Sequence, residues 1–224
     1  MLEPTLRRKI PPDSLAGVIS SPTVPRTLVL REAVADGFVG LRDELRKERP
    51  LVNISSTAIL VRAVARLLGG GTYVRLNSRV EGDEAVSFSQ VNVAVPVYRG
   101  GTVTAVIIDD AARRPVEEIS STLTSGTMSS DLSGATFALV NLGPYGMDWG
   151  LGLSFPQVAS TLVVGRIRAS YVVSETGGGR EAHVVGLALS VDPRAVGPDE
   201  AGAFLADLAA MLADSRRLRE AVLK

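Results

Sequence analysis

The side chains that most often carry acid, base or metal chemistry are scarce in this sequence. The 224 residues contain no cysteine and one histidine, His183. This composition excludes disulfides, thiolate metal sites and cysteine nucleophiles, and it leaves one candidate for a histidine base. His183 follows a polar loop and starts an apolar run. A structural role at the surface is therefore favoured over a catalytic one, and no metal site is predicted.

Acidic pairs and glycine runs are the other groups that could do chemistry. Asp83-Glu84 and Asp109-Asp110 could serve as acid–base pairs or metal ligands, but no histidine lies near either pair in the sequence. We interpret both pairs as solvated turns. The glycine runs at 69–71 and 177–179 lack the following Lys-Ser or Lys-Thr of a phosphate-binding loop, and neither opens a helix. They are interpreted as turns.

Composition limits the class of protein. Hydrophobic residues make up 46% of the chain, enough for a sizeable core, and 24 basic residues balance 24 acidic ones. A formal net charge of zero argues against binding nucleic acid through bulk electrostatics, and it favours association between chains. No apolar run approaches 18 residues, and the first residues lack the apolar segment of a signal peptide. We expect a cytoplasmic protein with no membrane or nucleic-acid partner.

The elements that must position any site follow from hydrophobic periodicity. Residues 1–26, rich in proline, are predicted to form an extended arm, and residues 27–224 a single domain. The predicted helices run from Asp36 to Pro50, from Ser55 or Ser56 to the glycines at 69–71, onward from Pro115 as first helical position, and from Asp199 to Leu212. The predicted strands are 27–31, 73–76, 85–97, 102–108, 136–142, 161–164, 167–173 and 184–191.

Helices and strands do not alternate regularly in this pattern, so a doubly wound nucleotide fold is excluded. Long strands with antiparallel connections and three or four helices predict an α+β domain. We find no internal repeat and no low-complexity linker.

Several short motifs, taken in chain order, resemble the catalytic domain of the dihydrolipoamide acyltransferases of the 2-oxo acid dehydrogenase complexes. The resemblance spans about residues 7–218. The segments that carry it are 7–10, Thr23-Val24-Pro25-Arg26, 38–45, 74–77, 91–97, 134–143, 155–159 and 189–198. That family has the chloramphenicol acetyltransferase fold, so the resemblance implies a mixed β-sheet packed with helices.

The resemblance also implies an assembly and a ligand. Family members form trimers, and each active-site channel runs through a subunit interface, with CoA entering from one end and the acyl acceptor from the other. Here a homotrimer is expected, with higher assembly left open, a small molecule in the channel, and CoA or acyl-CoA as the ligand the family would bind. No cofactor follows from the residues themselves. The lipoyl and peripheral-subunit-binding domains of the family are not seen in this sequence.

Three positions depart from the family pattern where its chemistry is done. The His of the family's D-H-R motif is Pro193 here, the Asp or Asn three residues after the Arg is Gly197, and the Ser of its T-I-S-N strand is Val140. In the family the His is the base, the Ser donates a hydrogen bond to the oxyanion, and the Asp or Asn also belongs to the catalytic site. The side chains of Pro, Gly and Val neither accept a proton nor donate a hydrogen bond. We therefore expect that ordinary acyl transfer is lost.

Some polar residues of these motifs survive. Asp192 and Arg194 are expected to form a structural ion pair, and Asp199 to be the N-cap of the last helix. Asp192, Asp199 and His183 are the weak candidates for a replacement base. The channel is expected to be lined by the set Arg26, Val140, Asn141, Pro193 and Gly197.

Three functions remain open at this point. The first is a repurposed homotrimer whose channel binds or transforms an apolar or acyl-bearing small molecule, such as a natural-product intermediate. The second is a CoA-dependent acyltransferase that uses an unorthodox base. The third is a non-catalytic scaffold that assembles with an active paralogue. A fold alone does not choose among them.

Overall fold

The computed structural model describes residues 4–9, 26–99, 102–127, 131–151, 155, 157–173 and 177–224. The strands are β1 (Pro4–Lys9), β2 (Thr27–Val34), β3 (Ser78–Glu81), β4 (Glu84–Phe88), β5 (Val93–Arg99), β6 (Thr102–Ile108), β7 (Phe137–Asn141), β8 (Ser160–Val164), β9 (Arg168–Val173) and β10 (Gly179–Val191). The helices are α2 (Asp36–Glu48), α3 (Ser56–Gly69), α4 (Val116–Ser125), α5 (Pro198–Ala213) and α6 (Ser215–Leu223), with a short 3-10 turn, η1 (Gly143–Tyr145).

A mixed β-sheet forms the centre of the molecule. Its strand order is β2-β10-β8-β7-β5-β6, and β9 pairs with β10 as a hairpin. Strands β5, β7 and β8 run parallel to one another, whereas β10 is antiparallel to β8, β9 and β2. This arrangement confirms the α+β class with a mixed sheet that the sequence predicts.

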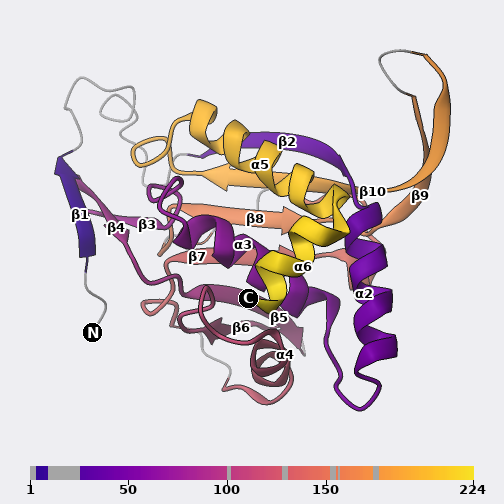
Figure 1. The fold of residues 1–224 in the computed structure, drawn as a ribbon. Coiled ribbons are helices and arrows are strands. Elements are labelled where there is room, and N and C mark those ends of the chain that lie inside the picture. The colour runs from indigo at the N-terminus through magenta and orange to yellow at the C-terminus, as the bar shows by residue number, and fades with distance from the viewer. Residues whose placement is uncertain are drawn as a thin grey trace.

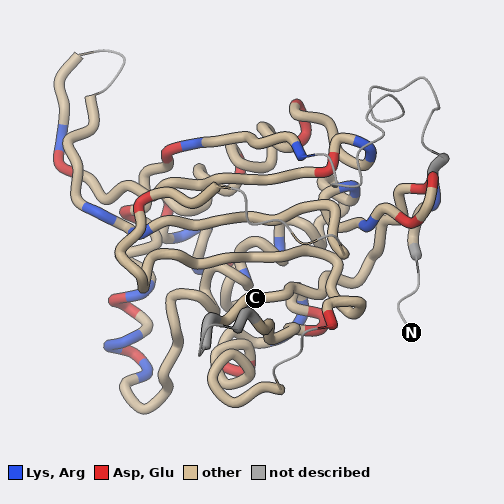
Figure 2. Tube along the Cα trace, turned by 180° about the vertical axis from the view of Figure 1, so that it is seen from behind, with Lys and Arg blue, Asp and Glu red and all other residues tan. Residues whose placement is uncertain are grey.

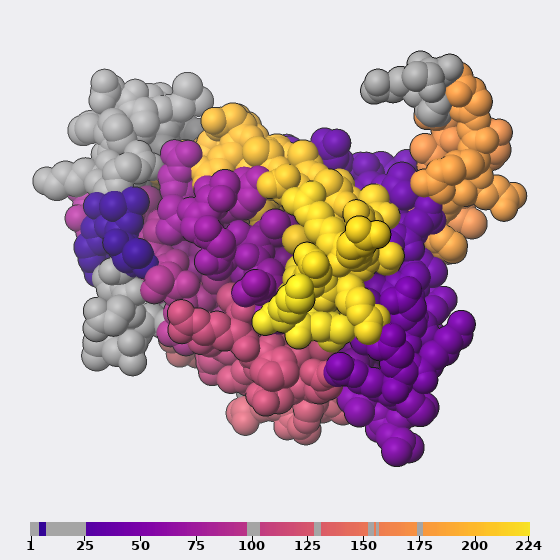
Figure 3. All heavy atoms as spheres, in the orientation of Figure 1, coloured from indigo at the N-terminus to yellow at the C-terminus, as the bar shows by residue number. Residues whose placement is uncertain are grey.

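The helices cover one face of this sheet (Figure 1), and the space-filling view of the same side shows α5 and α6 packed over it (Figure 3). Their apolar stripes meet the inward residues of the strands in one core. The ring of Phe204 on α5 lies 6.3 Å from that of Phe137 on β7 and 5.3 Å, edge to face, from Tyr73. None of the helices in the described part of the chain is long and apolar enough to cross a bilayer.

The opposite face of the sheet carries small side chains instead. Two small buried clusters lie there, one around Ala94 and Ala138 and the other formed by Val140, Val163 and Ala188. Phe155 packs against both clusters. Seen from behind, the strands have no described helix in front of them, and charged residues lie mostly at the edges of the face (Figure 2). This apolar face therefore lacks the thick cover that the helices give to the other one.

The predicted arm begins with a strand. β1 pairs with β4 in a separate three-stranded sheet of order β1-β4-β3, which lies beside the main body (Figure 1). Residues 10–25 of the arm, including most of the segment Thr23 to Arg26, fall outside the described residues.

The hairpin of β9 and β10 projects beyond the rest of the sheet (Figure 1). Ion pairs fix its base to three other segments. Arg168 contacts Glu32 on β2 at 2.8 Å and Arg180 contacts Asp36 on α2 at 2.6 Å. Just before β9, Arg166 contacts Asp148 at 2.5 Å. These ion pairs fix the orientation of the hairpin relative to the main sheet and helix α2.

Several sequence predictions are wrong in detail. The segment 73–76 is a turn rather than a strand, and the predicted strand 85–97 is two strands, β4 and β5, separated at 89–92. Pro115 is the N-cap of α4 rather than its first residue. The helix predicted from Asp199 to Leu212 is α5, but the sequence prediction lacks α6, which begins directly after it. Asp214 ends α5 and caps α6 through its carboxylate, which accepts from the N–H groups of Arg216 and Arg217.

The first turn of α2 sits directly against the junction of α5 and α6. A Cβ atom on Gly37 would lie 2.5 Å from the backbone nitrogen of Ser215 and 2.6 Å from backbone atoms of Asp214. Gly40, one turn later, would place its Cβ at an ordinary 3.9 Å from the Ser215 side chain. The missing side chain at Gly37 therefore permits the close approach of the two helical segments.

This contact predicts opposite effects for the same substitution in one helix. We expect Gly37→Ala to destabilise the protein by about 1–3 kcal/mol, because the new methyl group collides with backbone that cannot move away. Gly40→Ala should instead stabilise it by about 0.5–1 kcal/mol through higher helix propensity. Urea denaturation of both variants measures the difference. Equal stabilisation by both substitutions would contradict the packing described here.

Candidate functional site

The loop that follows β10 contains Pro193 and Gly197, two positions that the sequence resemblance assigns to the family's catalytic groups. Asp192 is 1% exposed, and its carboxylate accepts hydrogen bonds from the backbone N–H, the Nε and an Nη of Arg194 at 3.0, 3.0 and 2.7 Å. The backbone N–H groups of Ala195 and Val196 donate to the Asp192 carbonyl oxygen. Hydrogen bonding to this carboxylate raises the pKa of the Arg194 guanidinium. The Asp192 carboxylate therefore has a structural role, because its hydrogen bonds to Arg194 stabilise the loop.

Pro193 lies exposed at the tip of this loop, and Gly197 ends it. Gly197 is the N-cap of α5, with Pro198 as first helical residue, so the expected N-cap role of Asp199 is wrong. Asp199 lies within the first turn instead. A Cβ atom built on Gly197 would collide with the Oδ1 atom of Asp199. The Asp199 carboxylate thus occupies the space in which a side chain at position 197 would begin.

Arg26 fixes a neighbouring segment of backbone. Its guanidinium donates to the carbonyl oxygens of Ala159, Phe155 and Val158 at 2.9, 2.9 and 3.1 Å. Burial lowers the pKa of this guanidinium, and the charge of Asp192 opposes the shift. Arg26 is therefore a structural cation next to the Asp192 loop, with most of its donors directed at main-chain carbonyls.

Val140 and Asn141 end strand β7 and point to opposite faces of the sheet, as successive residues of a strand do. Val140 is buried with Val163 and Ala188 on the face without helices. The amide of Asn141 donates from Nδ2 to Thr57 Oγ1 at 2.9 Å, and its Oδ1 accepts from the N–H of Gly143 at 3.0 Å. The two residues thus belong to different surroundings, although the sequence predicts that they line the same channel.

One chain does not bring Val140 and Pro193 together. Val140 pairs with Val163 on β8, and Val163 pairs with Ala188 on β10. The three residues from Ala188 to Val191 advance about 10 Å along the strand and two strand spacings add about 10 Å sideways, so the end of β10 lies about 14 Å from Val140. Pro193 follows beyond that end. Pro193 and Val140, which the sequence resemblance assigns to the family's base and oxyanion donor, therefore lie toward opposite ends of the sheet.

His183 is remote from both positions. It lies on the hairpin part of β10, opposite Ala169 of β9. Its backbone N–H donates to Asp36 Oδ1 at 2.7 Å, and its ring Nδ1 lies 3.1 Å from the same oxygen. The hydrogen bond from the His183 backbone is the main reason why the pKa of Asp36 is lowered. His183 thus helps to fasten the hairpin to α2.

Two hydroxyl groups that the sequence did not single out lie on the same face as Val140. Thr161 of β8 and Ser190 of β10 pair directly across the strands, one row from Val163 and Ala188. Both side chains are buried, and neither hydroxyl has a hydrogen-bond partner in the described part of the chain. Unpaired buried hydroxyls cost free energy, so this row offers polar groups that can still be used. Only the alternating pattern of β8 and β10 could have indicated them.

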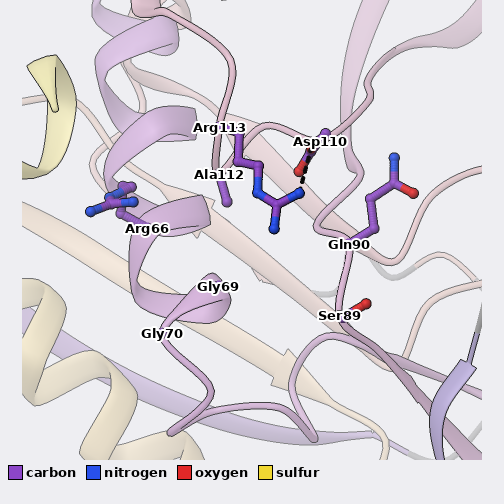
Figure 4. Close-up of a pocket in the computed structure, with 8 residues that line it drawn as sticks. All are labelled: Arg66, Gly69, Gly70, Ser89, Gln90, Asp110, Ala112 and Arg113. Carbon is purple, nitrogen blue, oxygen red and sulfur yellow. Dashed lines mark ion pairs between the residues drawn. The ribbon is translucent and has the colours of Figure 1, made fainter.

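A cavity of about 420 Å³ lies apart from these positions, at the C-terminal end of α3. Its lining residues are Arg66, Gly69, Gly70, Ser89, Gln90, Asp110, Ala112 and Arg113 (Figure 4). Arg113 turns toward Asp110, and their charged atoms are 3.8 Å apart. None of the residues singled out for the family's chemistry lines it. Among the described residues, no three acidic or histidine side chains are grouped to hold a metal ion.

Comparison with known proteins identifies relatives of this fold. The family described as 2-oxoacid dehydrogenases acyltransferase (catalytic domain) matches residues 16–219. The lipoamide acyltransferase component of the branched-chain alpha-keto acid dehydrogenase complex of Bacillus subtilis is 25% identical over 198 residues, 83% of this chain and 46% of that protein. The mouse mitochondrial pyruvate dehydrogenase protein X component is 26% identical over 211 residues, 89% of this chain and 41% of that protein. The chain spans less than half the length of these relatives.

Solved structures share the fold at lower identity. The dihydrolipoamide acetyltransferase of Azotobacter vinelandii superposes with a TM-score of 0.78 at 18% identity, over 90% of this chain and 85% of that one. The cubic core of the pyruvate dehydrogenase multienzyme complex gives 0.76 at 18% identity, with the same coverage. Chloramphenicol acetyltransferase gives 0.54 at 11% identity, over 84% and 88%. With its sequence matched over residues 16–219 and its fold shared with these cores, the chain belongs to the family of 2-oxoacid dehydrogenase acyltransferase catalytic domains.

Proposed function

We propose that this member of the family has lost the family's acyl-transfer chemistry and acts as a homotrimer whose interfacial channel binds or transforms an apolar or acyl-bearing small molecule. The observation that carries the proposal is the state of the loop after β10. Pro193 and Gly197 offer no side chain that can take a proton, and the one buried carboxylate, Asp192, is occupied by Arg194. The base of the family therefore has no replacement in its own position.

The spacing of the substituted positions supports their assignment. The Azotobacter vinelandii work names a serine, a histidine and an asparagine in the catalytic mechanism of that enzyme, with the asparagine four positions after the histidine. Pro193 and Gly197 are also four positions apart. Loss of a general base lowers a rate by about 10²–10⁴-fold and loss of an oxyanion donor by about 10²–10³-fold. These effects are not additive, but either one is large.

The distance between Val140 and Pro193 supports an assembly. Two positions about 14 Å apart or more on one sheet can line one channel only if Val140 of one chain faces Pro193 of another. Such a contact joins different surfaces of two copies and closes into a ring when the rotation between them fits. One solved structure with the same fold is the cubic core of a multienzyme complex, which is consistent with assembly from repeated copies. A homotrimer is the ring that we propose here.

Exposed apolar side chains lie on the face that would be covered. Leu28 and Leu30 of β2 pair with Ser190 and Ala188 and so point to the same side as Val140. They are 44% and 52% exposed. The ring of Trp149 packs near Gly186, in the next row of β10, and is also partly exposed. Apolar side chains grouped in this way are typical of a surface that another chain covers.

The contents of this face suit a ligand that is mostly apolar with a few polar atoms. Val140, Val163 and Ala188 offer apolar contact, and the hydroxyls of Thr161 and Ser190 remain able to donate hydrogen bonds. An acyl group suits this face, because its aliphatic chain can contact the apolar side chains and its carbonyl oxygen can accept a hydrogen bond from a hydroxyl. Binding sites of this composition fix orientation through a small number of polar groups.

A second candidate, a CoA-dependent acyltransferase with an unorthodox base, is favoured by one observation. The carboxylate of Asp199 occupies the place where a side chain at position 197 would begin. Asp199 can therefore supply a carboxylate close to the position of the family's Asp or Asn. It does not supply an imidazole at Pro193 or a hydroxyl at Val140, so it replaces one group of three.

The proposed trimer makes Leu30 sensitive to charge. We expect the wild-type chain to sediment with three times its 23.5 kDa mass, and Leu30→Asp to sediment as a monomer, because the carboxylate would be buried without a partner in the interface. Leu51→Asp is the matched control, since Leu51 is 98% exposed on the loop between α2 and α3. A monomeric wild type, or a trimer that survives Leu30→Asp, would contradict the proposed interface.

The loss of chemistry is tested with the family's own substrates. We expect no transfer of the acetyl group from acetyl-CoA to dihydrolipoamide above the uncatalysed rate, and no heat of binding when CoA or acetyl-CoA is titrated to millimolar concentration. Binding of CoA at micromolar affinity together with acetyl transfer would contradict the proposal and would support the second candidate, an acyltransferase with an unorthodox base. Binding without turnover would mean that the CoA end of the channel persists without the chemistry.

If acetyl transfer is found, a substitution of Asp199 tests whether this residue is the general base. In the second candidate, Asp199→Asn should lower kcat by about 10²-fold or more, because a general base contributes about that much. Asp83→Asn, an exposed carboxylate at the turn between β3 and β4, is the control. Equal rates in all three proteins would exclude Asp199 as the base.

A further inference from the structure

Two cavities meet at the edge of the sheet where the parallel strands β5, β7 and β8 end. One has a volume of about 280 Å³ and the other about 260 Å³, and the residues that line both are Asn141 and Pro144. Crevices outside the carboxyl ends of parallel strands are preferred places for ligands in open sheets. All of the lining residues come from one chain, so these cavities exist without any partner subunit.

The first cavity, which we call the arginine pocket, combines an apolar wall with two cations. Its wall includes Phe38, Leu60 and Val164, and its charged residues are Arg42 and Arg166. Arg42 donates from Nε to Asp43 at 3.0 Å, and Arg166 donates from Nε to Asp148 at 2.5 Å. A guanidinium carries five N–H donors, so each arginine retains donors that these carboxylates do not use.

The second cavity, the valine pocket, is lined by apolar and neutral polar side chains. It is lined along one side by Val95, Pro96 and Val97 of β5 and closed by Leu123 of α4. No Asp, Glu, Lys or Arg lines it in the described part of the chain. It therefore suits the hydrocarbon end of a molecule whose polar end lies elsewhere.

The side chain of Asn141 stands between the two pockets. Its amide is held from both ends, by the hydrogen bond to Thr57 at 2.9 Å and by the hydrogen bond from the Gly143 N–H at 3.0 Å. Thr57 lines only the valine pocket, and Gly143 lines only the arginine pocket. The amide thus separates the two pockets. Its removal would break two hydrogen bonds of ordinary strength.

We propose that the arginine pocket binds the carboxylate-bearing end of an acyl chain and that Asn141 sets the length of chain the protein accepts. A cavity of about 280 Å³ holds roughly nine groups the size of a water molecule, so a chain of about eight carbons fills it. A longer chain must pass the Asn141 amide to reach the valine pocket. This inference rests on the proposed function for its ligand class, an acyl-bearing molecule, but not on the trimer.

A series of straight-chain alkanoates from butanoate to dodecanoate tests the role of Asn141. Each methylene buried should tighten binding about fourfold. In the wild type we expect this gain to stop near octanoate, and in Asn141→Ala to continue to dodecanoate, as measured by titration calorimetry. Asn53→Ala, at an exposed asparagine before α3, should keep the wild-type limit. The same limit in wild type and Asn141→Ala would overturn the assignment, as would failure of every alkanoate to bind at millimolar concentration.

The charge of the ligand is tested with matched amides. Alkanamides of the same length should bind the wild type at least tenfold more weakly than alkanoates, and Arg166→Gln should weaken this preference because, of the two arginines that line the pocket, it leaves Arg42. Arg113→Gln, at an exposed arginine on another cavity, should retain it. Equal binding of amides and acids by the wild type would overturn the carboxylate class.

One further measurement separates this inference from the proposed function. Because the pockets belong to one chain, the monomeric Leu30→Asp variant should bind octanoate with wild-type affinity. Loss of octanoate binding in that variant would overturn the single-chain site and would assign the ligand to the interfacial channel. Acetyl transfer by the wild type would contradict the proposed function while leaving the chain-length result unaffected.

Discussion

The direction of β10 relative to β7 and β8 constrains everything that this fold can do. β7 runs parallel to β8, while β10 returns antiparallel on the other side of β8. The end of β7 and the end of β10 therefore lie at opposite edges of one sheet. Any chemistry that needs groups from both ends must recruit a second chain, whereas a pocket built at one edge needs only its own. Val140 and Pro193 could share a site only if a second chain contributes one of them. The two cavities beside Asn141 are lined by residues of one chain.

Stability of the fold does not depend on the groups that the family uses for catalysis. The loop after β10 is held by the Asp192–Arg194 pair and by backbone hydrogen bonds to the Asp192 carbonyl, and none of these involves the side chain at 193 or 197. Arg26 holds the neighbouring segment through main-chain carbonyls. Residues 193 and 197 could therefore change without loss of the contacts that hold this loop, and a shared fold says little about shared activity.

The sequence predicts those elements whose signals are local. Ser55 was a good N-cap candidate because its hydroxyl needs only the N–H of Ala58, three residues away. The predicted strand at 85–97 failed because the buried amides of Asn77 and Asn92 take over the backbone partners: Asn77 donates to the carbonyls of Phe88 and Gln90, and Asn92 to that of Gly134. Those partners are 11, 13 and 42 residues away, so no local pattern reports them. The N-cap at Asp199 failed because Pro198 suits the first helical position and starts α5 earlier.

The candidate site was predictable only as a set of positions. The order of motifs located Val140, Asn141, Pro193 and Gly197, and the predicted strand 136–142 already implies that Val140 and Asn141 point to opposite faces. The sequence could not show what each of these faces meets in the folded chain. Val140 and the next residue, Asn141, lie in different surroundings, the first in an apolar cluster and the second between two cavities. A change at Val140 alters the face that another chain would cover, and a change at Asn141 alters the boundary between two cavities within the chain. Because Val140 and Asn141 face different surroundings, a substitution at Val140 can change the proposed interfacial channel without changing the residues that line the two cavities.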